Sequence, residues 1–352
     1  MNEAVKSTPR VLLVSPLTFS YHVTICEALR QIGFDPIWWN DKASTSTFYK
    51  LALRLLPRLT RLIAESHFIE QIDRMPADSV DHVLLIKAEG MTARVVRHLR
   101  ARHPRATLGL HLWDGKENVN GIDKLVPLAD AVSSFDPVDA RENGWNYRPL
   151  FARNVAMPAA GHEPKVFDWC FIGTIHSDRH RVISRLRKLT GGAARSFVFA
   201  YFQSPMVLKI RKLFDWTLWS APKDTLSTMP MSADDVARIT AQSRTVLDVE
   251  HPRQRGLTMR TIETLLAGNK LLTTNRHLLD CDLYDPSRAQ IIDRNAPRID
   301  PAFLSQAVKH IPQELRDRYS CEAWAKELID IQSHRGGRAG QDQKFRLNRS
   351  SS

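Results

Sequence analysis

The residues best suited to binding chemistry lie between positions 246 and 275, where the sequence reads VLDVEHPRQRGLTMRTIETLLAGNKLLTTN. An apolar strand leads into a polar loop with Arg253, Arg255 and Gly256, and Thr258 then begins a helix. The first turn of a helix has N–H groups without intrahelical partners, so arginines and a glycine beside it form an anion site. A diphosphate fits this chemistry, because guanidinium groups hold phosphate oxygens in pairs.

An acidic residue follows at a distance that extends this site. Glu263 lies five residues after Thr258, just past the first turn, where its carboxylate can accept hydrogen bonds from two ribose hydroxyls. A purely structural interpretation stays open, in which Thr258 caps the helix and Glu263 complements the helix dipole. The whole combination favours nucleotide binding more strongly than either residue does alone.

The segment from Gly173 to Arg179 is a second candidate for phosphate binding. Gly173 and Thr174 end a predicted strand, and a glycine lets a ligand approach the backbone closely. His176 and Arg179 follow within reach of a phosphate. The alternative is an ordinary strand-to-helix turn, capped by the serine or the aspartate between them.

The elements that position these residues alternate between strands and helices along the whole chain. Apolar runs without alternation predict buried parallel strands; they cover 11–14, 34–39, 80–86, 107–112, 131–135, 167–173, 196–202, 245–249, 270–274 and 290–293. Helical spacing is found over 22–31, 48–73 with a break at Pro57, 92–103, 178–189, 207–218, 234–243, 258–267, 303–311 and 314–329. This order predicts an α/β fold with doubly wound parallel sheets, and ligands at the carboxyl ends of the strands.

The alternation is interrupted once, by a stretch rich in Pro, Gly and Ala. It predicts a first domain over 1–151, a linker over 152–165 and a second domain over 166–331, with a disordered basic tail over 332–352. The terminal helix from Glu314 could instead return to the first domain.

The pattern GLTMRTIE followed by KLLTTN resembles the donor-binding region of GT-B glycosyltransferases. More narrowly, it resembles the lipopolysaccharide and capsule glycosyltransferases near the CgeB-like group. The resemblance covers about residues 11 to 331, and further segments that carry it are Trp113-Asp114, SFDPVDA at 134–140, YRPLF at 147–151, FIGTIHSDR at 171–179 and Asp293-Arg294.

The resemblance implies two Rossmann-like domains facing a central cleft, with a nucleotide-sugar donor held mainly by the C-terminal one. Glu263 would bind the ribose, and backbone N–H groups near Gly256 and Thr258 would bind the diphosphate. The full candidate donor set is Gly173, Thr174, His176, Arg179, His251, Arg253, Gly256, Leu257, Thr258, Arg260 and Glu263. Many retaining relatives have a second glutamate eight residues before the ribose glutamate. Arg255 stands there, so the stereochemistry is left open.

An inverting enzyme needs a base that takes a proton from the acceptor hydroxyl. Asp114, Glu89 and His22 follow strands or open helices on the side where ligands are expected, and Asp114 is the first choice. Asp136 precedes a proline and is better explained as a turn residue. Each of the three candidates could equally be a helix cap or a surface charge.

The implied function is transfer of a sugar from a nucleotide-sugar to a surface polysaccharide or a lipid-linked glycan acceptor. A phosphoalcohol transferase of similar fold would have much the same donor loop. A third alternative is a non-catalytic basic protein that binds polysaccharide or nucleic acid. The intact diphosphate loop and Glu263 count against that alternative.

The chain is basic, with a formal net charge of +12. The tail from Ile331 has five Lys or Arg and one acidic residue, so it contributes +4 and leaves +8 for the rest. This charge suits a phosphorylated ligand or an anionic membrane surface. Nucleic acid is not an expected partner, because no nucleic-acid-binding motif occurs.

Metal and targeting signals are missing from the sequence. The four cysteines are far apart and have no zinc-ligand spacing, which favours free thiols in a reducing compartment. No DxD motif lies in a plausible loop, so neither a metal nor another cofactor is expected. The N-terminus has no apolar signal segment, and no run approaches the ~18 apolar residues of a spanning helix. A cytoplasmic location is expected, including the inner face of the cell membrane.

Two stretches combine basic residues with large apolar ones, at 49–63 and 207–219. Such helices suit a membrane interface, where a lipid-linked acceptor would lie. The alternative for each is a helix with its apolar side in the core and a solvated basic side.

Overall fold

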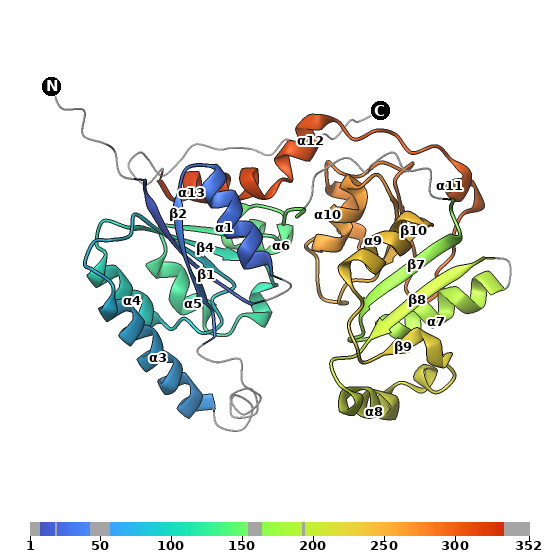
Figure 1. The fold of residues 1–352 in the computed structure, drawn as a ribbon, viewed down its shortest axis with the longest axis horizontal. Helices are drawn as coiled ribbons and strands as arrows, with labels where there is room; N and C mark the ends of the chain where they lie inside the picture. The colour runs from blue at the N-terminus through green and yellow to red at the C-terminus, as the bar shows by residue number, and fades with distance from the viewer. Residues whose placement is uncertain (1–7, 18–19, 43–56, 154–163, 192–193, 334–352) are drawn as a thin grey trace. The chain divides into compact units, whose positions relative to one another are not determined.

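The computed structural model describes residues 8–17, 20–42, 57–153, 164–191 and 194–333. Most of the predicted tail and most of the predicted linker lie outside these residues, as does the first part of the helix predicted over 48–73. The first two residues of the predicted tail, Gln332 and Ser333, are helical instead. The chain divides into two compact units, one formed by residues 1–153 and 320–352 and the other by residues 154–319. Figure 1 shows the elements of both units.

The first unit contains a parallel sheet that has six strands within the described residues, in the order β2-β1-β3-β4-β5-β6. Their bounds are β1 (Arg10–Ser15), β2 (Asp35–Asn40), β3 (His82–Ile86), β4 (Thr107–Leu112), β5 (Ala131–Ser134) and β6 (Asn146–Tyr147). The order reverses between β1 and β3, because β2 lies on one side of β1 and β3 on the other. Ligands in such sheets bind at this switch point.

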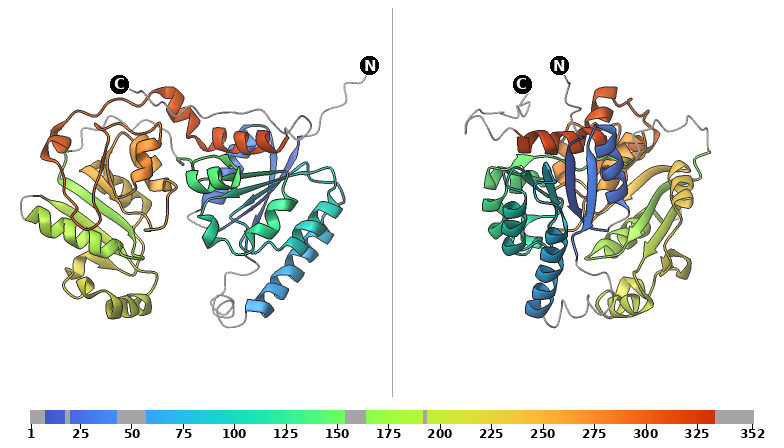
Figure 2. Two further views of the ribbon diagram at one scale, coloured as in Figure 1. Left: turned by 180° about the vertical axis from the view of Figure 1, so that it is seen from behind. Right: turned by 60° about the vertical axis from the view of Figure 1, so that its left-hand side comes forward.

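Helices cover both faces of the first sheet, as Figure 2 shows. They are α1 (Tyr21–Gln31), α3 (Pro57–Arg74), α4 (Ala93–Arg102), α5 (Ile122–Leu125) and α6 (Pro137–Asn143), with short turns η1 (Lys116–Asn118) and η2 (Val126–Leu128). Thr92 caps α4 through the backbone N–H of Val95, as predicted. Asp136 accepts from two backbone N–H groups and caps α6, so its place is at a helix start rather than in a simple turn.

The second unit contains another parallel sheet, which also has six strands in the described part of the chain, ordered β12-β11-β10-β7-β8-β9. Their bounds are β7 (Phe167–Thr174), β8 (Ser196–Tyr201), β9 (Leu226–Ser227), β10 (Ser243–Asp248), β11 (Lys270–Thr273) and β12 (Ala289–Ile291). This is the strand order of the dinucleotide-binding fold, and its switch point lies between β7 and β10. Trp169, Phe171 and Leu247 on these two strands are fully buried.

The remaining helices of the second unit follow its strands. They are α7 (Arg179–Thr190), α8 (Pro205–Phe214), α9 (Ala233–Ala241), α10 (Met259–Leu266), α11 (Pro301–Ser305) and α12 (Gln313–Arg318), with turns η4 (Trp216–Leu218), η5 (Lys223–Thr225) and η6 (Arg276–Asp280). Among the described helices of both units, none is long and apolar enough to span a membrane.

The last helix, α13 (Cys321–Ser333), packs on the first unit, although the sequence-based boundaries place residues up to 331 in the second domain. Trp324 is fully buried against His111 and Phe151, with ring centroids 5.2 and 4.8 Å away. Gln332 lies so close to Gly109 of β4 that a Cβ there would overlap its side chain. The apolar face of α13 therefore completes the first unit's core. The predicted helix from Glu314 is two helices, and its first part, α12, stays with the second unit.

Candidate functional site

The carboxyl ends of β7 and β10 are joined by one arginine. Arg179, at the start of α7, donates from Nη1 to the carbonyl of Thr174 at 2.8 Å. Its Nε donates to the carbonyl of Val249 at 2.6 Å. Burial lowers the pKa of Arg179 to about 10, against the opposing carboxylate of Asp248. Arg179 therefore fixes the two strand ends at the switch point, and its positive charge stays buried there.

The N-terminus of α10 is fastened to the same place. Thr258 caps the helix, because its Oγ1 accepts from the backbone N–H of Thr261 at 3.0 Å. The hydroxyls of Thr258 and Thr261 both donate to one oxygen of Asp248, at 2.5 and 2.7 Å. Asp248 is buried at the end of β10. The helix start is thus held against the strand end by two hydrogen bonds.

Arg260 occupies the space that Gly173 leaves open. A Cβ on Gly173 would lie 3.3 Å from Nη1 of Arg260 and 3.4 Å from the ring of Phe171. The sequence assigns this space to a ligand, whereas in the structure a guanidinium group from α10 lies against it. The result is a cation at the end of β7, next to the free N–H groups of the helix start.

Two histidines lie together beyond these strand ends. The rings of His176 and His251 are 5.9 Å apart, and Nδ1 of His176 is 3.1 Å from the hydroxyl of Ser177. Ser177 has a φ of 45°, a conformation that few non-glycine residues adopt. Burial, together with the nearby charge of Arg179, lowers the pKa of His176 to about 4. His176 is therefore a neutral imidazole at neutral pH.

The loop between β10 and α10 is held by side-chain amides. Asn275 donates to the carbonyls of Arg255 and Gly256, both at 3.2 Å, and Gln254 donates to Gly256 at 3.0 Å. Leu257 is buried, so only its backbone remains available to a ligand. Arg253 is exposed, and its N–H donates to Nδ1 of His251 at 3.3 Å.

Glu263 lies half-buried on α10, between the buried Ile262 and Thr264. It is on the same helix as the cap and as Arg260. The structure therefore places it in the same element as the anion-binding groups, and its role toward ribose stays a prediction.

A buried ion pair beside the switch point was missed by sequence reasoning. Arg294, which follows β12, donates to both the carbonyl and the carboxylate of Glu250, at 2.6 and 2.5 Å, and to Asp178 at 2.8 Å. Thr274 donates to the other carboxylate oxygen of Glu250. Each of these side chains follows a strand of the second sheet, and Arg294 also belongs to a segment that carries the family resemblance.

In the first unit, two of the predicted catalytic residues meet at a lysine. Nζ of Lys87 lies 2.8 Å from Glu89 and 3.3 Å from Asp114. Lys42 forms a second ion pair with Glu89 at 2.9 Å. Burial acts to raise the pKa of Glu89, but the two lysines outweigh it and the pKa is lowered. A lowered pKa makes Glu89 a weaker base than an ordinary glutamate. Asp114 pairs with Lys87 alone of these two lysines.

The backbone after β3 is strained at this cluster. Lys87 and Ala88 have φ values of 64° and 56°, and the N–H of Ala88 donates to the carbonyl of Ile86 at 2.7 Å. This is a γ-turn of the rare form with positive φ. Such strain concentrates at functional sites, where the surrounding structure maintains it. The turn directs Lys87 and Glu89 to the carboxyl end of the first sheet.

Asp41 is a second residue that the sequence did not single out. It follows β2 and is fully buried, and among the described residues no side chain forms a hydrogen bond to its carboxylate oxygens. Burial raises its pKa to about 6, while Lys42 opposes this. Gly90 makes the burial possible, because a Cβ there would lie 2.0 Å from the carbonyl of Asp41.

His22 lies in a different contact from the other two catalytic candidates. Its ring stacks on Trp38 of β2 with centroids 4.1 Å apart, and Trp38 donates to Ser15 at 2.9 Å. Burial lowers the pKa of His22. The described contacts thus bring Glu89 and Asp114 together but do not join His22 to them.

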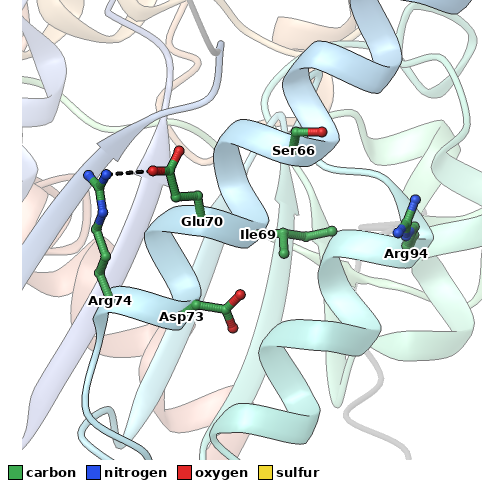
Figure 3. A pocket seen from close by; sticks show the side chains of 6 residues that line it. All are labelled: Ser66, Ile69, Glu70, Asp73, Arg74 and Arg94. Carbon is green, nitrogen blue, oxygen red and sulfur yellow. Dashed lines mark hydrogen bonds and ion pairs between the residues drawn. The ribbon is translucent and has the colours of Figure 1, made fainter.

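A hollow on the first unit lies away from all predicted site residues. It is formed between α3 and α4, as Figure 3 shows, and Glu70 and Arg74 at its edge form an ion pair at 2.5 Å. Its lining residues all belong to these two helices, and none follows the end of a strand. The carboxyl edges of the two sheets are therefore better candidates for chemistry.

Known structures share this architecture, although no protein-family model and no curated protein sequence matches the chain. The N-terminal domain of trehalose-6-phosphate phosphatase from Candida albicans matches with a TM-score of 0.59 and 10% identity, over 95% of this chain and 98% of that one. OtsA in its apo form matches with a TM-score of 0.56 and 12% identity, over 92% and 99%. HepE from Anabaena, in complex with UDP and glucose, matches with a TM-score of 0.56 and 10% identity, over 92% of this chain and 99% of that one. The chain has the GT-B fold.

The GT-B fold accounts for the two parallel sheets, which the sequence predicted. At identities of 10 to 12%, the likeness establishes the fold alone. Within this GT-B fold, the described cationic groups gather at the switch point of the second sheet, whereas the acid and lysine cluster lies at the carboxyl edge of the first.

Proposed function

We propose that this chain is a glycosyltransferase that moves a sugar from a nucleotide-sugar donor to a glycan or lipid-linked acceptor. The observation that carries the proposal is the arrangement at the second switch point. There the start of α10, the guanidinium groups of Arg179 and Arg260 and the neutral His176 surround the ends of β7 and β10. Fixed cations and helix N–H groups are what a leaving diphosphate needs.

A structural neighbour supports the choice of ligand. HepE, which shares the fold, was solved with UDP and glucose. We extend this chemistry to the present chain and expect the second unit to bind the nucleotide. The narrower assignment to lipopolysaccharide or capsule synthesis belongs to the same proposal and rests on the sequence resemblance.

A thermal-shift screen with UDP, GDP, CDP and TDP tests the nucleotide site directly, because a bound ligand raises the melting temperature. At least one diphosphate should raise it. No shift with any of them, confirmed by titration calorimetry, would remove the basis of the proposal. Incubation with the matching nucleotide-sugar in the absence of an acceptor then separates a sugar transferase from a phosphoalcohol transferase. Only the former lets water take the place of the acceptor, which releases the free sugar and the nucleoside diphosphate.

Glu263 is the proposed ribose ligand. Glu263→Ala should weaken UDP binding by about tenfold or more, as expected for charged hydrogen bonds. The variant should also lose the preference of the wild-type protein for UDP over 2′,3′-dideoxy-UDP. Glu314→Ala, at an exposed position of α12, is the matched control and should change neither property. If the folded Glu263→Ala variant keeps the preference, another residue binds the ribose.

Asp114 is the proposed base toward the acceptor hydroxyl, with Lys87 holding its carboxylate at 3.3 Å. Asp114→Asn should lower kcat while leaving donor affinity unchanged, because the donor groups are in the other unit. Glu89→Gln should have the smaller effect on kcat, since the pKa of Glu89 is lowered by two lysines.

A further inference from the structure

An apolar surface on α8 and the turn after it remains exposed in the fold. Six large side chains there are each between 45% and 75% exposed. We call them the α8 patch: Met206, Ile210, Leu213, Phe214, Trp216 and Trp219. A contiguous exposed patch of this kind marks an interaction surface. Figure 1 labels α8 in the second unit.

Helical spacing explains why these side chains share one face. Met206, Ile210 and Leu213 recur at steps of four and three residues, which places them on one side of α8. Val207 and Leu208 point the other way and pack against the core of the unit. The helix therefore has an inner apolar face that anchors it and an outer one that the described residues leave open.

The two tryptophans are held on a rigid turn. Asp215 and Thr217 are buried, and Thr217 bonds to Asp215 at 2.6 Å and to His180 at 2.7 Å. Trp219 donates from Nε1 to the carbonyl of Lys212 at 2.9 Å. Because these buried hydrogen bonds hold the turn, Trp216 and Trp219 are exposed as part of the ordered fold and not on a loose segment.

The charged residues of α8 all have one sign. Residues 205–214 contain Lys209, Arg211 and Lys212 and no acidic residue. Lys209 is exposed, and Nζ of Lys212 lies 5.3 Å from the centre of the Trp219 ring. Basic side chains next to Trp, Phe and Leu are the composition of helices that lie in the interface of an anionic membrane.

The same helix lies close to the candidate donor site. Burial lowers the pKa of His176, and the charge of Arg211 on α8 contributes to that shift. Arg211 is thus within electrostatic range of His176, while the outer side of α8 carries the apolar patch. The patch therefore lies on an element whose charge acts on the candidate donor site.

We propose that the α8 patch docks the protein onto an anionic lipid surface, with the two tryptophans and Phe214 entering the headgroup region. The proposal rests on the proposed function and deepens it, by naming the surface that brings the donor unit to a lipid-linked acceptor. Each basic residue near such a surface adds about 1 kcal/mol of attraction. Tryptophan favours this depth, because its ring is apolar and its N–H is polar.

Vesicle flotation tests the proposal with a matched pair of variants. The full chain is mixed with vesicles of phosphatidylcholine alone or of phosphatidylcholine and phosphatidylglycerol in equal amounts, at low and high salt. Leu213→Gln with Phe214→Gln removes apolar surface from the patch. Leu189→Gln with Leu279→Gln makes the same change at two exposed leucines outside it.

The wild-type protein and the control should float with the phosphatidylglycerol vesicles at low salt, and salt should weaken this binding. The affinity of the patch variant for these vesicles should be lower by about tenfold or more, since two apolar side chains no longer enter the lipid. Tryptophan fluorescence of the wild-type protein should shift to shorter wavelength on binding, and Trp216→Phe should reduce the shift. No binding of the wild-type protein at low salt, or equal binding by the patch variant and the control, overturns the proposal.

The other possible occupant of such a surface is a second copy of the chain, and light scattering tests for this dimer. A wild-type dimer that becomes monomeric in the patch variant would make the patch a protein interface and overturn lipid docking. UDP affinity is measured for every variant. Vesicle binding without nucleotide binding would remove the proposed function but leave the docking surface, so the two failures are distinguishable.

Discussion

The hydroxyl of Thr258 donates a 2.5 Å hydrogen bond to the carboxylate of Asp248, and its oxygen also caps α10 by accepting from Thr261. One side chain therefore stabilises the helix and sets where its N-terminus lies relative to β10. A substitution of Thr258 should therefore change both helix stability and anion binding. Comparison with the loss of a cap elsewhere in the fold distinguishes the two effects.

We expect Thr258→Val to lower stability by about 1 kcal/mol, the usual cost of a lost cap. It should also weaken UDP-glucose binding by about fivefold, equivalent to one hydrogen bond, because one of the two hydrogen bonds between the start of α10 and Asp248 is lost. Thr92→Val removes the cap of α4 in the first unit and is the control. Chemical unfolding and calorimetry should show a similar loss of stability in both variants but weaker binding only in Thr258→Val. Unchanged affinity in Thr258→Val would separate the cap from the ligand site.

Donor binding should take up a proton at His176. Its pKa is lowered from 6.5 to about 4 by burial and by nearby cations, and a bound diphosphate offsets those cations, so the pKa rises in the complex. A group whose pKa rises on binding strengthens the affinity as the pH falls, here from 6.5 toward 4. UDP-glucose is the suitable ligand, because the charge of its diphosphate is constant over this range. Calorimetry in buffers of different ionisation enthalpy should detect the proton, and His176→Gln should abolish it. Equal uptake by this variant would contradict the assignment.

Asp41 should make the first unit less stable as the pH rises. Its folded pKa of about 6 lies above the ordinary 3.8, so the folded state holds the proton more tightly than the unfolded state. The free energy of unfolding therefore falls between pH 3.8 and about 6, by about 2–3 kcal/mol, and stays lower above that window. Thermal melts across the window should show that Asp41→Asn lacks this fall, whereas Asp35→Asn, at an exposed position, keeps it. The idea fails if Asp41→Asn and the wild-type protein follow the same pH dependence.

Sugar transfer should continue in EDTA. Arg179, Arg260 and the start of α10 supply fixed positive charge where the diphosphate leaves, which is the task a divalent cation performs in other enzymes. We expect equal rates with EDTA and with added magnesium or manganese. Conversely, Arg260→Gln should slow the reaction, whereas Arg244→Gln, whose arginine pairs with Asp168 at 3.3 Å, should not. Strict dependence on a metal would show that the arginines do not fill this role.

The long elements of the fold were predictable because their signals are local. Buried strands such as β1 and β10 are short apolar runs, and Thr92 and Thr258 are residues that commonly cap helices. The two-residue strands β6 and β9 have no such pattern. They exist because their backbones complete a sheet edge, which is a tertiary effect.

Candidate site residues could be named from the sequence as a prediction, but their contacts could not. Gly173 indicated close approach, yet the group that approaches is Arg260, eighty-seven positions later in the chain. Nothing local marks Asp41, because its burial depends on the missing side chain of Gly90. The spacing of α8 predicted an amphipathic helix, but only the packed structure shows that large apolar residues also lie on its outer side.

The return of α13 to the first unit sets an order for synthesis on the ribosome. His111 and Phe151 are covered by Trp324, and Gly109 receives Gln332. The N-terminus of the chain leaves the ribosome first, and domains fold as their residues become available. The sheet within residues 154–319 can therefore form before α13, the last helix of the first unit, has been synthesised. The unit that is translated first is the last to acquire its full core, and its apolar surface is the part of the nascent protein most in need of protection.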